Sequence, residues 1–132
     1  MPSLEALRER FSHDKYATAL TGAEIREAEP GRAVCALPLR EEHMNANHTP
    51  MGGAIFTLAD FAFAVAVNGH AERVTVSQHV SITFLSPARG TTLLAEVFFF
   101  NDWGTTLIYT VDVTDDAGTH VAYATVNGFT VG

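Results

Sequence analysis

Apolar and polar residues alternate through the second half of the chain in the pattern of half-buried β-strands. The clearest case is residues 74–84, where the alternation is interrupted only at Gln78. Further strands are predicted over residues 92–101, around residues 107–113 and over residues 120–130. Because only short turns separate these strands, neighbouring strands are predicted to be antiparallel.

The beginning of the chain contains a short helix and a pair of strands. Ser3 is a suitable N-cap for an amphipathic helix over residues 4–11, which belongs to an N-terminal helical segment over residues 1–20. A Pro-Gly turn separates residues 23–29 from residues 32–40, which predicts a β-hairpin.

The segment from Thr49 to Gly69 has the pattern of a buried helix. It begins with Thr-Pro, ends with Asn-Gly and is apolar on nearly all sides. Two strands are predicted before this helix and four after it. The economical arrangement is an α+β domain in which one antiparallel sheet curls around the central helix.

The composition favours a single globular domain. A chain of 132 residues and 14.2 kDa is long enough for one hydrophobic core and too short for two, so one domain is predicted over residues 1–132. Hydrophobic residues make up 47% and charged residues 17%, which excludes disorder and favours a buried subunit interface. The net charge of −7 argues against nucleic acid and anionic membranes as partners.

The sequence predicts a cytoplasmic protein without a cofactor. Cys35 is the single cysteine, and the charged N-terminus lacks the apolar core of a signal peptide. The most apolar stretch, residues 52–69, contains Asp60 and is too short for a membrane span. The six histidines show no metal-ligand spacing, so no metal is predicted.

One stripe of the central helix is small and polar. At 100° per residue it contains Gly53, Thr57, Asp60, Ala64 and Asn68. An aspartate in the middle of an apolar helix is costly when unpaired, so Asp60 requires either hydrogen-bonding hydroxyls or a catalytic role. The residue types alone leave these two readings equally open.

Two consecutive glycines begin the same helix. Backbone N–H groups in a first helical turn lack intrahelical acceptors, and the absent side chains of Gly52 and Gly53 allow an oxyanion to come close. The pair therefore indicates half of an oxyanion hole, and tight packing is the alternative reading.

Residues 45–60, which read NANHTPMGGAIFTLAD, resemble the signature of PaaI-type acyl-CoA thioesterases of the hotdog fold. The signature has an Asn fifteen residues before an Asp, a Gly-Gly pair between them and a Leu-x-Asp ending. Residues 81–90 resemble the strand and Pro-containing turn that follow the central helix in this family. The resemblance extends over roughly residues 24–130.

Two positions depart from the family pattern. His48 stands where the family has Gly, and Met51 stands where it has the His of His-Gly-Gly. Because methionine cannot donate a hydrogen bond, the contribution of the family histidine is lost or supplied differently. His48 is a candidate substitute, and a surface loop histidine is an equally good interpretation.

The resemblance implies thioester hydrolysis. Asp60 would activate a water or attack the carbonyl itself, and the N–H of Gly52, with Gly53, would stabilise the oxyanion. Asn45 would orient the water or the thioester oxygen. Ser77 occupies a position that often carries a hydroxyl in the family and could hydrogen-bond Asp60, although strand alternation places it opposite the apolar face.

The resemblance also implies binding surfaces and an assembly. Phe56, Phe61 and Phe63 are candidates to line an acyl tunnel, and Arg73 or Arg89 to contact the phosphates of CoA. Family members pair their sheets across a homodimer, with Asp from one subunit facing Asn and Gly-Gly of the other. We therefore expect a homodimer, and the doubled homotetramer stays open, as does the identity of the acyl group.

Two other functions compete with hydrolysis. A non-catalytic acyl-CoA binding module would explain Met51, although Asp60 and Asn45 are retained. A 3-hydroxyacyl thioester dehydratase of the same fold would need a His and acid pair, with His43 or His48 as the histidine.

Overall fold

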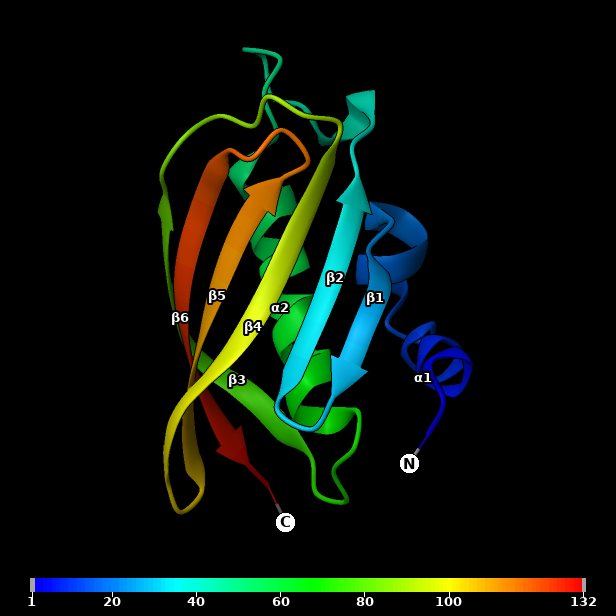
Figure 1. Ribbon diagram of the computed structural model, residues 1–132, viewed down its shortest axis with the longest axis vertical. Helices are drawn as coiled ribbons and strands as arrows, with labels where there is room; N and C mark the ends of the chain where they lie inside the picture. Colours follow the sequence, from blue (N-terminus) through cyan, green and yellow to red (C-terminus); the bar gives the residue numbers. More distant parts are fainter. Residues whose placement is uncertain (1, 132) are drawn as a thin grey trace.

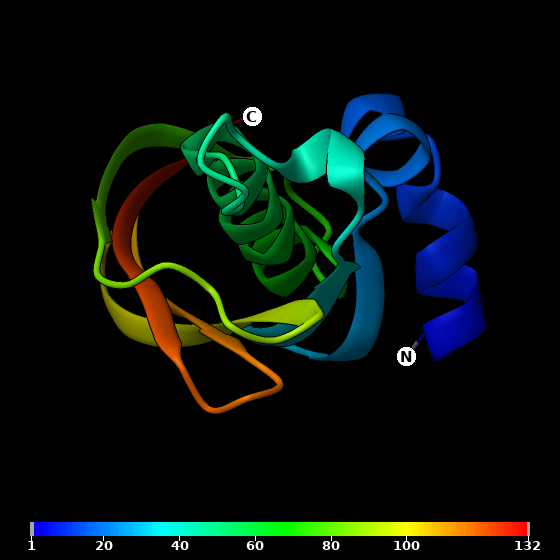
Figure 2. The ribbon, with the colours of Figure 1, turned by 90° about the horizontal axis from the view of Figure 1, so that it is seen from above.

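In the computed structural model, which describes residues 2–131, one six-stranded antiparallel sheet wraps around a long helix (Figures 1 and 2). The strand order is β1-β2-β4-β5-β6-β3. The strands are β1 (Glu24–Glu29), β2 (Arg32–Pro38), β3 (Thr75–Phe84), β4 (Thr92–Trp103), β5 (Thr106–Asp115) and β6 (His120–Thr130). The helices are α1 (Leu4–Phe11), the π-helix η1 (Tyr16–Thr21), the 3-10 helix η2 (Glu41–His43) and α2 (Gly52–Asn68). The predicted sheet around a central helix is confirmed.

The core fills the space between the concave face of the sheet and α2 (Figure 2). Ala59, Ala62 and Ala66 of α2 are at most 2% exposed, and their small side chains allow the sheet to approach the helix closely. Phe63 packs edge to face against Tyr109 of β5, with 5.5 Å between the ring centroids. The apolar side of the helix therefore packs into the concave face of the sheet, and η1 and Phe11 of α1 pack against it from outside the sheet.

The predicted cap of α1 is confirmed, whereas the Thr-Pro signal lies ahead of α2, whose N-cap is Met51 without a side-chain cap. The Ser3 hydroxyl accepts a hydrogen bond from the N–H of Ala6 at 3.1 Å, which caps α1 at the predicted residue. The helix α2 begins two residues after Pro50 and ends at Asn68, directly before Gly69. The start of α1 and the end of α2 follow from residues adjacent in sequence, and for that reason they were predictable.

The alternation predicted for residues 74–84 is wrong in its first half, because β3 carries a bulge between Ser77 and His79. One extra residue in the strand reverses which side chains face the core. Val76, predicted on the apolar face, is 46% exposed, whereas Thr75 is buried. The bulge thus places Ser77 on the inner face, toward α2.

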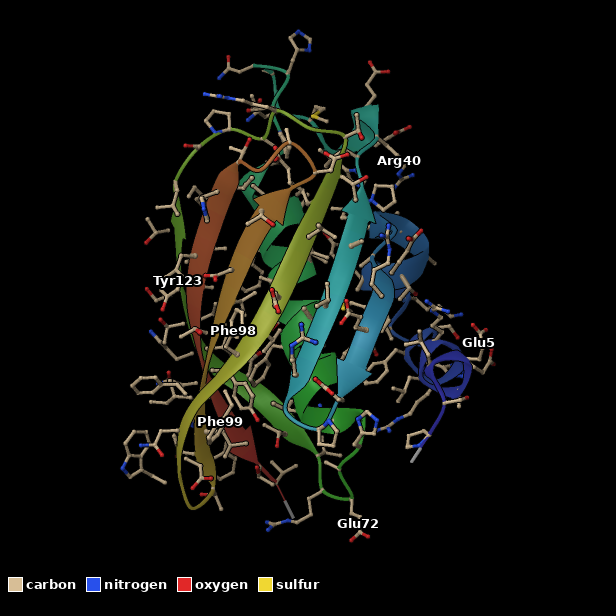
Figure 3. The ribbon with its side chains drawn as sticks, in the orientation of Figure 1. Glu5, Arg40, Glu72, Phe98, Phe99 and Tyr123 are labelled. Carbon is tan, nitrogen blue, oxygen red and sulfur yellow. The ribbon has the colours of Figure 1, made fainter. Side chains whose placement is uncertain are left out.

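Two surfaces of the sheet expose apolar side chains. The strand β3 is an edge strand, and Val74, Val76 and Phe84 on it or beside it are about half exposed. On β4 and β6, Phe98 and Tyr123 are also exposed (Figure 3). A long edge strand with apolar residues readily pairs with another chain, which fits the predicted subunit interface.

The segment between α1 and β1 folds back onto α2 as the π-helix η1. Arg40 fastens η1 to η2, because its guanidinium donates to the carbonyls of Leu20 at 2.7 Å and Thr21 at 3.2 Å. The buried ring of His43 contacts the same Thr21 carbonyl through Nε2 at 2.7 Å. The turn lies at the end of the helical segment predicted over residues 1–20, and its π-helical form was not predicted.

Within residues 2–131, no helix is long and apolar enough to span a membrane. Over the same residues, no three His, Cys, Asp or Glu side chains gather closely enough to hold a metal ion. Cys35 is fully buried in β2, and burial raises the pKa of its thiol to about 12.

The carboxylate of Asp115 organises the turn after β5. It accepts hydrogen bonds from four backbone N–H groups, at distances of 2.7–3.0 Å, donated by Arg89, Gly90, Ala117 and Thr119. Replacing Asp115 by alanine is expected to lower the free energy of unfolding by about 3 kcal/mol, because four partly buried hydrogen bonds lose their charged acceptor. Urea unfolding measures this loss, and the exposed Asp116→Ala change is the control with the smaller expected loss.

The penalty for Asp115→Ala is also expected to depend on pH. Burial alone would raise the pKa of Asp115, but the N–H groups of Gly90, Thr119 and Arg89 outweigh burial and hold the pKa well below its usual range. A depressed carboxyl pKa stabilises the fold above the unfolded-state pKa of about 4, and the contribution is lost as the pH falls below it. A penalty that stays constant between about pH 6 and pH 2 would contradict this account.

Candidate active site

The polar stripe of α2 forms the wall of a cavity of about 580 Å³. Gly53, Thr57, Asp60 and Ala64 line it from the helix, as the spacing predicted. The opposite wall is formed by residues 14–17, the last two of which begin η1. Phe56 and Phe61 complete the lining and give the cavity an aromatic, largely apolar character.

Asp60 is the acidic group that α2 contributes to this cavity. Burial raises the pKa of its carboxyl, a hydrogen bond with the Ser77 hydroxyl lowers it, and the negative charge of Asp14 raises it further. The net shift is upward. A carboxylate with a raised pKa is a stronger base than an ordinary aspartate, so Asp60 suits proton abstraction.

Ser77 reaches Asp60 because of the bulge in β3. Regular alternation would direct its hydroxyl away from α2, and the extra residue turns it toward the helix. The structure therefore brings Ser77 and Asp60 together, a pairing that alternation alone argued against.

The N-terminus of α2 presents two backbone donors. In the chain from residue 2 to residue 131, neither the N–H of Gly52 nor that of Gly53 donates to an acceptor, and the Met51 side chain does not cap the helix. A Cβ on Gly53 would meet nothing within 4 Å, whereas one on Gly52 would lie 2.9 Å from the ring of Phe84. Both donors thus lack a partner in the described residues, and the space beside Gly53 is open, whereas the Phe84 ring lies against Gly52.

Asn45 organises the loop before α2. Its Oδ1 accepts hydrogen bonds from the N–H groups of Asn47 at 2.9 Å and Thr49 at 3.2 Å, and its Nδ2 donates to the Thr49 hydroxyl at 3.0 Å. Asn45 and Gly52 line a different cavity, of about 360 Å³, together with Phe84. Asn45 thus lies with the Gly52 donor and not in the cavity of Asp60.

A single chain does not bring all the predicted catalytic groups to one point. Gly52 and Asp60 are eight residues apart on α2, which corresponds to about 12 Å along the helix axis at 1.5 Å per residue. One thioester carbonyl cannot contact both groups. The structure therefore separates the predicted residues into two candidate half-sites, one at Asp60 and one at Gly52 and Asn45.

Comparisons with known proteins place this geometry in a family. The family model described as a domain of unknown function (DUF4442) matches residues 16–129. Acyl-coenzyme A thioesterase PaaI of Escherichia coli K12 is 30% identical over 113 residues, which cover 85% of this chain and 79% of that protein. The solved structure of the E. coli PaaI protein from the phenylacetic acid degradation operon has a TM-score of 0.83 and 25% identity, covering 98% of this chain and 97% of that one.

This chain belongs to the PaaI-type family of hotdog-fold thioesterases. The predicted fold and the predicted enzyme class, a thioester hydrolase, are confirmed. A protein of Archaeoglobus fulgidus named "Putative esterase" is 37% identical over 115 residues, covering 86% of this chain and 73% of that protein. A solved structure of a Streptococcus mutans protein bound to acetyl CoA has a TM-score of 0.76 and 26% identity, covering 83% of this chain and 89% of that one.

The first departure of this thioesterase from the family pattern has a conformational consequence. His48 has φ = +62°, and it is the non-glycine residue with positive φ in the described chain, residues 2–131. Glycine adopts this left-handed conformation without a Cβ clash, so the glycine of the family signature would suit the position in this chain. The His48 side chain is exposed in the loop before α2.

Replacing His48 by glycine is expected to raise the free energy of unfolding by about 0.5–1 kcal/mol, because glycine adopts the left-handed conformation without the Cβ clash. The matched control is Asn47→Gly in the same loop, where φ is not positive and added flexibility is expected to destabilise. Thermal or urea unfolding distinguishes the two. Equal destabilisation by both changes would show that the strain at position 48 is negligible.

The second departure lies directly before the two free donors. Met51 is 59% exposed and lines a small cavity of about 260 Å³ with Gly53, His43 and Tyr16. Its side chain lies at the N-terminus of α2, where a histidine would add a hydrogen-bond donor. In this thioesterase the free hydrogen-bond donors at this end of α2 are the backbone N–H groups of Gly52 and Gly53.

The remaining predicted residues divide between the cavity and other parts of the molecule. Phe56 lines the Asp60 cavity, whereas Phe63 is 1% exposed and packs inside the core. The Arg89 side chain is exposed on the loop between β3 and β4, and its N–H serves the Asp115 turn. Both ring nitrogens of His43 are engaged inside the fold, since Nδ1 accepts from the Arg40 N–H at 2.9 Å, which argues against its use as a dehydratase acid.

Sequence reasoning missed the wall opposite the helix. Asp14, Lys15 and Tyr16 line the Asp60 cavity, although they lie more than forty positions before Asp60 in the sequence. No local motif identifies them, because π-helical turns lack a distinct hydrophobic period. The one available signal was the presence of acidic, basic and aromatic residues together in a short polar stretch.

Proposed function

We propose that this protein is an acyl-CoA thioesterase in which Asp60 is the general base or the nucleophile and the N–H groups of Gly52 and Gly53 form the oxyanion hole. The observation that carries the proposal is the position of Asp60, half-buried on the open stripe of α2 with a raised pKa and a cavity in front of it. The acyl-CoA substrate is supported by the name of the E. coli relative and by the acetyl CoA bound to the S. mutans protein.

The reaction needs one base and one oxyanion site. Asp60 takes a proton from water, and the resulting hydroxide adds to the thioester carbonyl carbon to give a tetrahedral oxyanion held by Gly52 and Gly53. The C–S bond then breaks, and CoA leaves as a thiolate, since a thiol pKa of about 8.5 makes it a good leaving group. If Asp60 attacks directly, the first product is a mixed anhydride that water hydrolyses to the free acid.

The two half-sites support a homodimer as the active unit. Because about 12 Å of helix separates Gly52 from Asp60, the donors that face Asp60 would come from a second copy. The exposed apolar edge strand β3 offers a surface for that copy, and pairing of the sheets agrees with the family resemblance. Asn45 of the same second copy would then orient the water or the thioester, and a further doubling would give a homotetramer.

The test is release of CoA thiol from a panel of aryl-acyl and alkyl-acyl CoA thioesters, followed with a chromogenic disulfide. Hydrolysis of at least one member, unchanged by EDTA, is the expected result, and the member with the highest kcat/KM identifies the acyl group. Substrates with long, branched or aromatic acyl groups test the aromatic lining of Phe56 and Phe61.

A non-catalytic acyl-CoA binding module is the second candidate, and Met51 is the observation that favours it. Binding of acyl-CoA without thiol release across the whole panel would support that function and overturn hydrolysis. Restoring the family residue with Met51→His would then be expected to produce measurable thiol release.

A further inference from the structure

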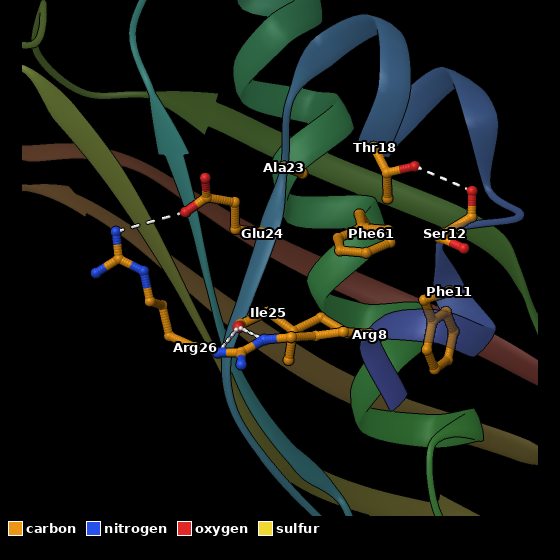
Figure 4. A pocket seen from close by; sticks show the side chains of 9 residues that line it. All are labelled: Arg8, Phe11, Ser12, Thr18, Ala23, Glu24, Ile25, Arg26 and Phe61. Atoms are coloured by element: carbon orange, nitrogen blue, oxygen red, sulfur yellow. Dashed lines mark hydrogen bonds and ion pairs between the residues drawn. The ribbon is translucent and has the colours of Figure 1, made fainter. Parts of the chain in front are cut away.

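A second cavity, of about 370 Å³, lies between α1, η1, β1 and α2 (Figure 4). Its apolar walls are the side chains of Phe11, Ala23, Ile25 and Phe61. Phe11 and Phe61 meet edge to face, with 6.0 Å between the ring centroids. The volume and the aromatic walls suit a small ligand with an apolar body.

Arg8 supplies a fixed cation to this cavity. Its Nε and Nη2 donate to the carbonyl of Ile25 at 3.1 and 3.0 Å, and its Nη1 donates to Glu5 at 2.7 Å (Figure 4 shows the bonds to Ile25). A guanidinium has five N–H groups, so two remain for a ligand. Because three bonds already hold the side chain, little conformational entropy is lost when it binds an anion.

The other polar groups direct an anion to Arg8. The Thr18 hydroxyl donates to the carbonyls of Ser12 and Asp14, at 3.3 and 3.0 Å, so its proton is already engaged. Glu24 and Arg26 lie 3.7 Å apart and offset each other's charge. Arg8 lines the cavity and keeps two N–H groups beyond those bonded to Ile25 and Glu5, although the Glu5 carboxylate at 2.7 Å partly offsets its charge.

We propose that this cavity is a second ligand site, which binds a small amphipathic monocarboxylate with its carboxylate on Arg8 and an aromatic or branched body between Phe11 and Phe61. An arginine at the edge of an apolar cavity matches this ligand class, because the carboxylate accepts paired N–H groups while the body displaces water from the rings. Arg8 and Arg26, which both line this cavity, are two of the eight Lys and Arg residues in a chain with a net charge of −7.

The site is coupled to the Asp60 cavity through shared walls. Phe61 lines both cavities, and the stretch 12–18 contributes Ser12 and Thr18 to one and residues 14–17 to the other. A ligand that immobilises Phe61 therefore changes the shape available to an acyl group. The free acid released by hydrolysis has the chemistry of this ligand, a consequence that rests on the proposed function.

Isothermal titration calorimetry on the full chain, with 3-phenylpropanoate as the probe, tests the site without any turnover. Two matched variants separate the cavities: Ala23→Leu fills this cavity, and Ala64→Leu adds the same side chain to the Asp60 cavity. We expect Ala23→Leu to weaken binding roughly tenfold or more and Ala64→Leu to change it less than about twofold. Thermal unfolding of each variant confirms that it is folded.

The charge requirement is tested with Arg8→Gln and with the neutral amide 3-phenylpropanamide. Each is expected to weaken binding roughly tenfold, the effect of losing a charge-assisted pair. If Arg8→Gln is unfolded, the amide comparison on the native chain decides the question. Three results would each overturn the proposal. They are equal affinity for the acid and the amide, weaker binding by Ala64→Leu than by Ala23→Leu, and no binding at about 10 mM acid. Because no CoA ester is present, these results do not depend on whether the chain hydrolyses thioesters.

Discussion

Asp60→Asn is expected to lower kcat for thioester hydrolysis by about a hundredfold or more, with a small change in KM. The amide has the size and shape of the carboxylate, but it can neither accept the proton of water nor attack a carbonyl, so the loss measures the base or nucleophile itself. Thiol release under saturating substrate, with the member of the panel that the wild type hydrolyses best, gives the ratio directly.

The same substitution is expected to stabilise the fold. The pKa of Asp60 is raised in the folded protein, chiefly by burial, so the charged carboxylate disfavours folding above that pKa. Removal of the charge should therefore raise the urea midpoint while activity falls, the opposing pattern expected of a catalytic group. A parallel loss of activity and stability would instead identify Asp60 as a structural residue.

The pH profile provides an independent check on Asp60. Activity is expected to fall on the acid side with an apparent pKa above the ordinary aspartate value of about 4, as the base becomes protonated. Lys15 and Tyr16 also line the cavity. Asp14, just before η1, raises the pKa of the Asp60 carboxyl, and Ser77 of β3 lowers it. Asp14→Asn should shift the acid limb to lower pH and Ser77→Ala to higher pH.

Gly52→Pro is expected to lower kcat by about a hundredfold, because it removes one oxyanion donor worth about 3 kcal/mol. Proline is tolerated at the first position of a helix, and Met51 already has the extended conformation that a following proline requires. The control is Gly52→Ala, which places the same Cβ against Phe84 but keeps the N–H. The comparison of the two variants isolates the donor from the steric effect.

The two inactive variants also test whether the site spans two chains. Mixing Asp60→Asn with Gly52→Pro under conditions that exchange subunits creates mixed dimers, in which one site has both an intact Asp60 and an intact Gly52. Random exchange should restore roughly a quarter of the wild-type activity. Full retention of activity by Gly52→Pro alone, or no recovery on mixing despite demonstrated exchange, would contradict an oxyanion hole supplied by the second copy.

The sequence by itself determined the elements and the stripe that carries Asp60. Ser3 and Gly69 act on neighbouring residues, so the start of α1 and the end of α2 followed from local chemistry. The helical period of 3.6 residues placed Gly53, Thr57 and Asp60 on one line before any tertiary contact was known. Alternation and short turns gave the antiparallel strands, and the motif over residues 45–60 gave the family.

Only the tertiary structure decided three features. They are the strand order, the direction of the Ser77 side chain toward α2, and the residues that form the cavity wall opposite Asp60. Strand order depends on pairing between distant segments, and a bulge depends on the partner strand that it faces, so alternation within one strand cannot reveal either. Asp14 reaches the site because η1 packs on α2, a contact between segments far apart in sequence. The distance along α2 between Gly52 and Asp60 then divides the candidate catalytic groups into two half-sites, because a rigid helix cannot fold back on itself.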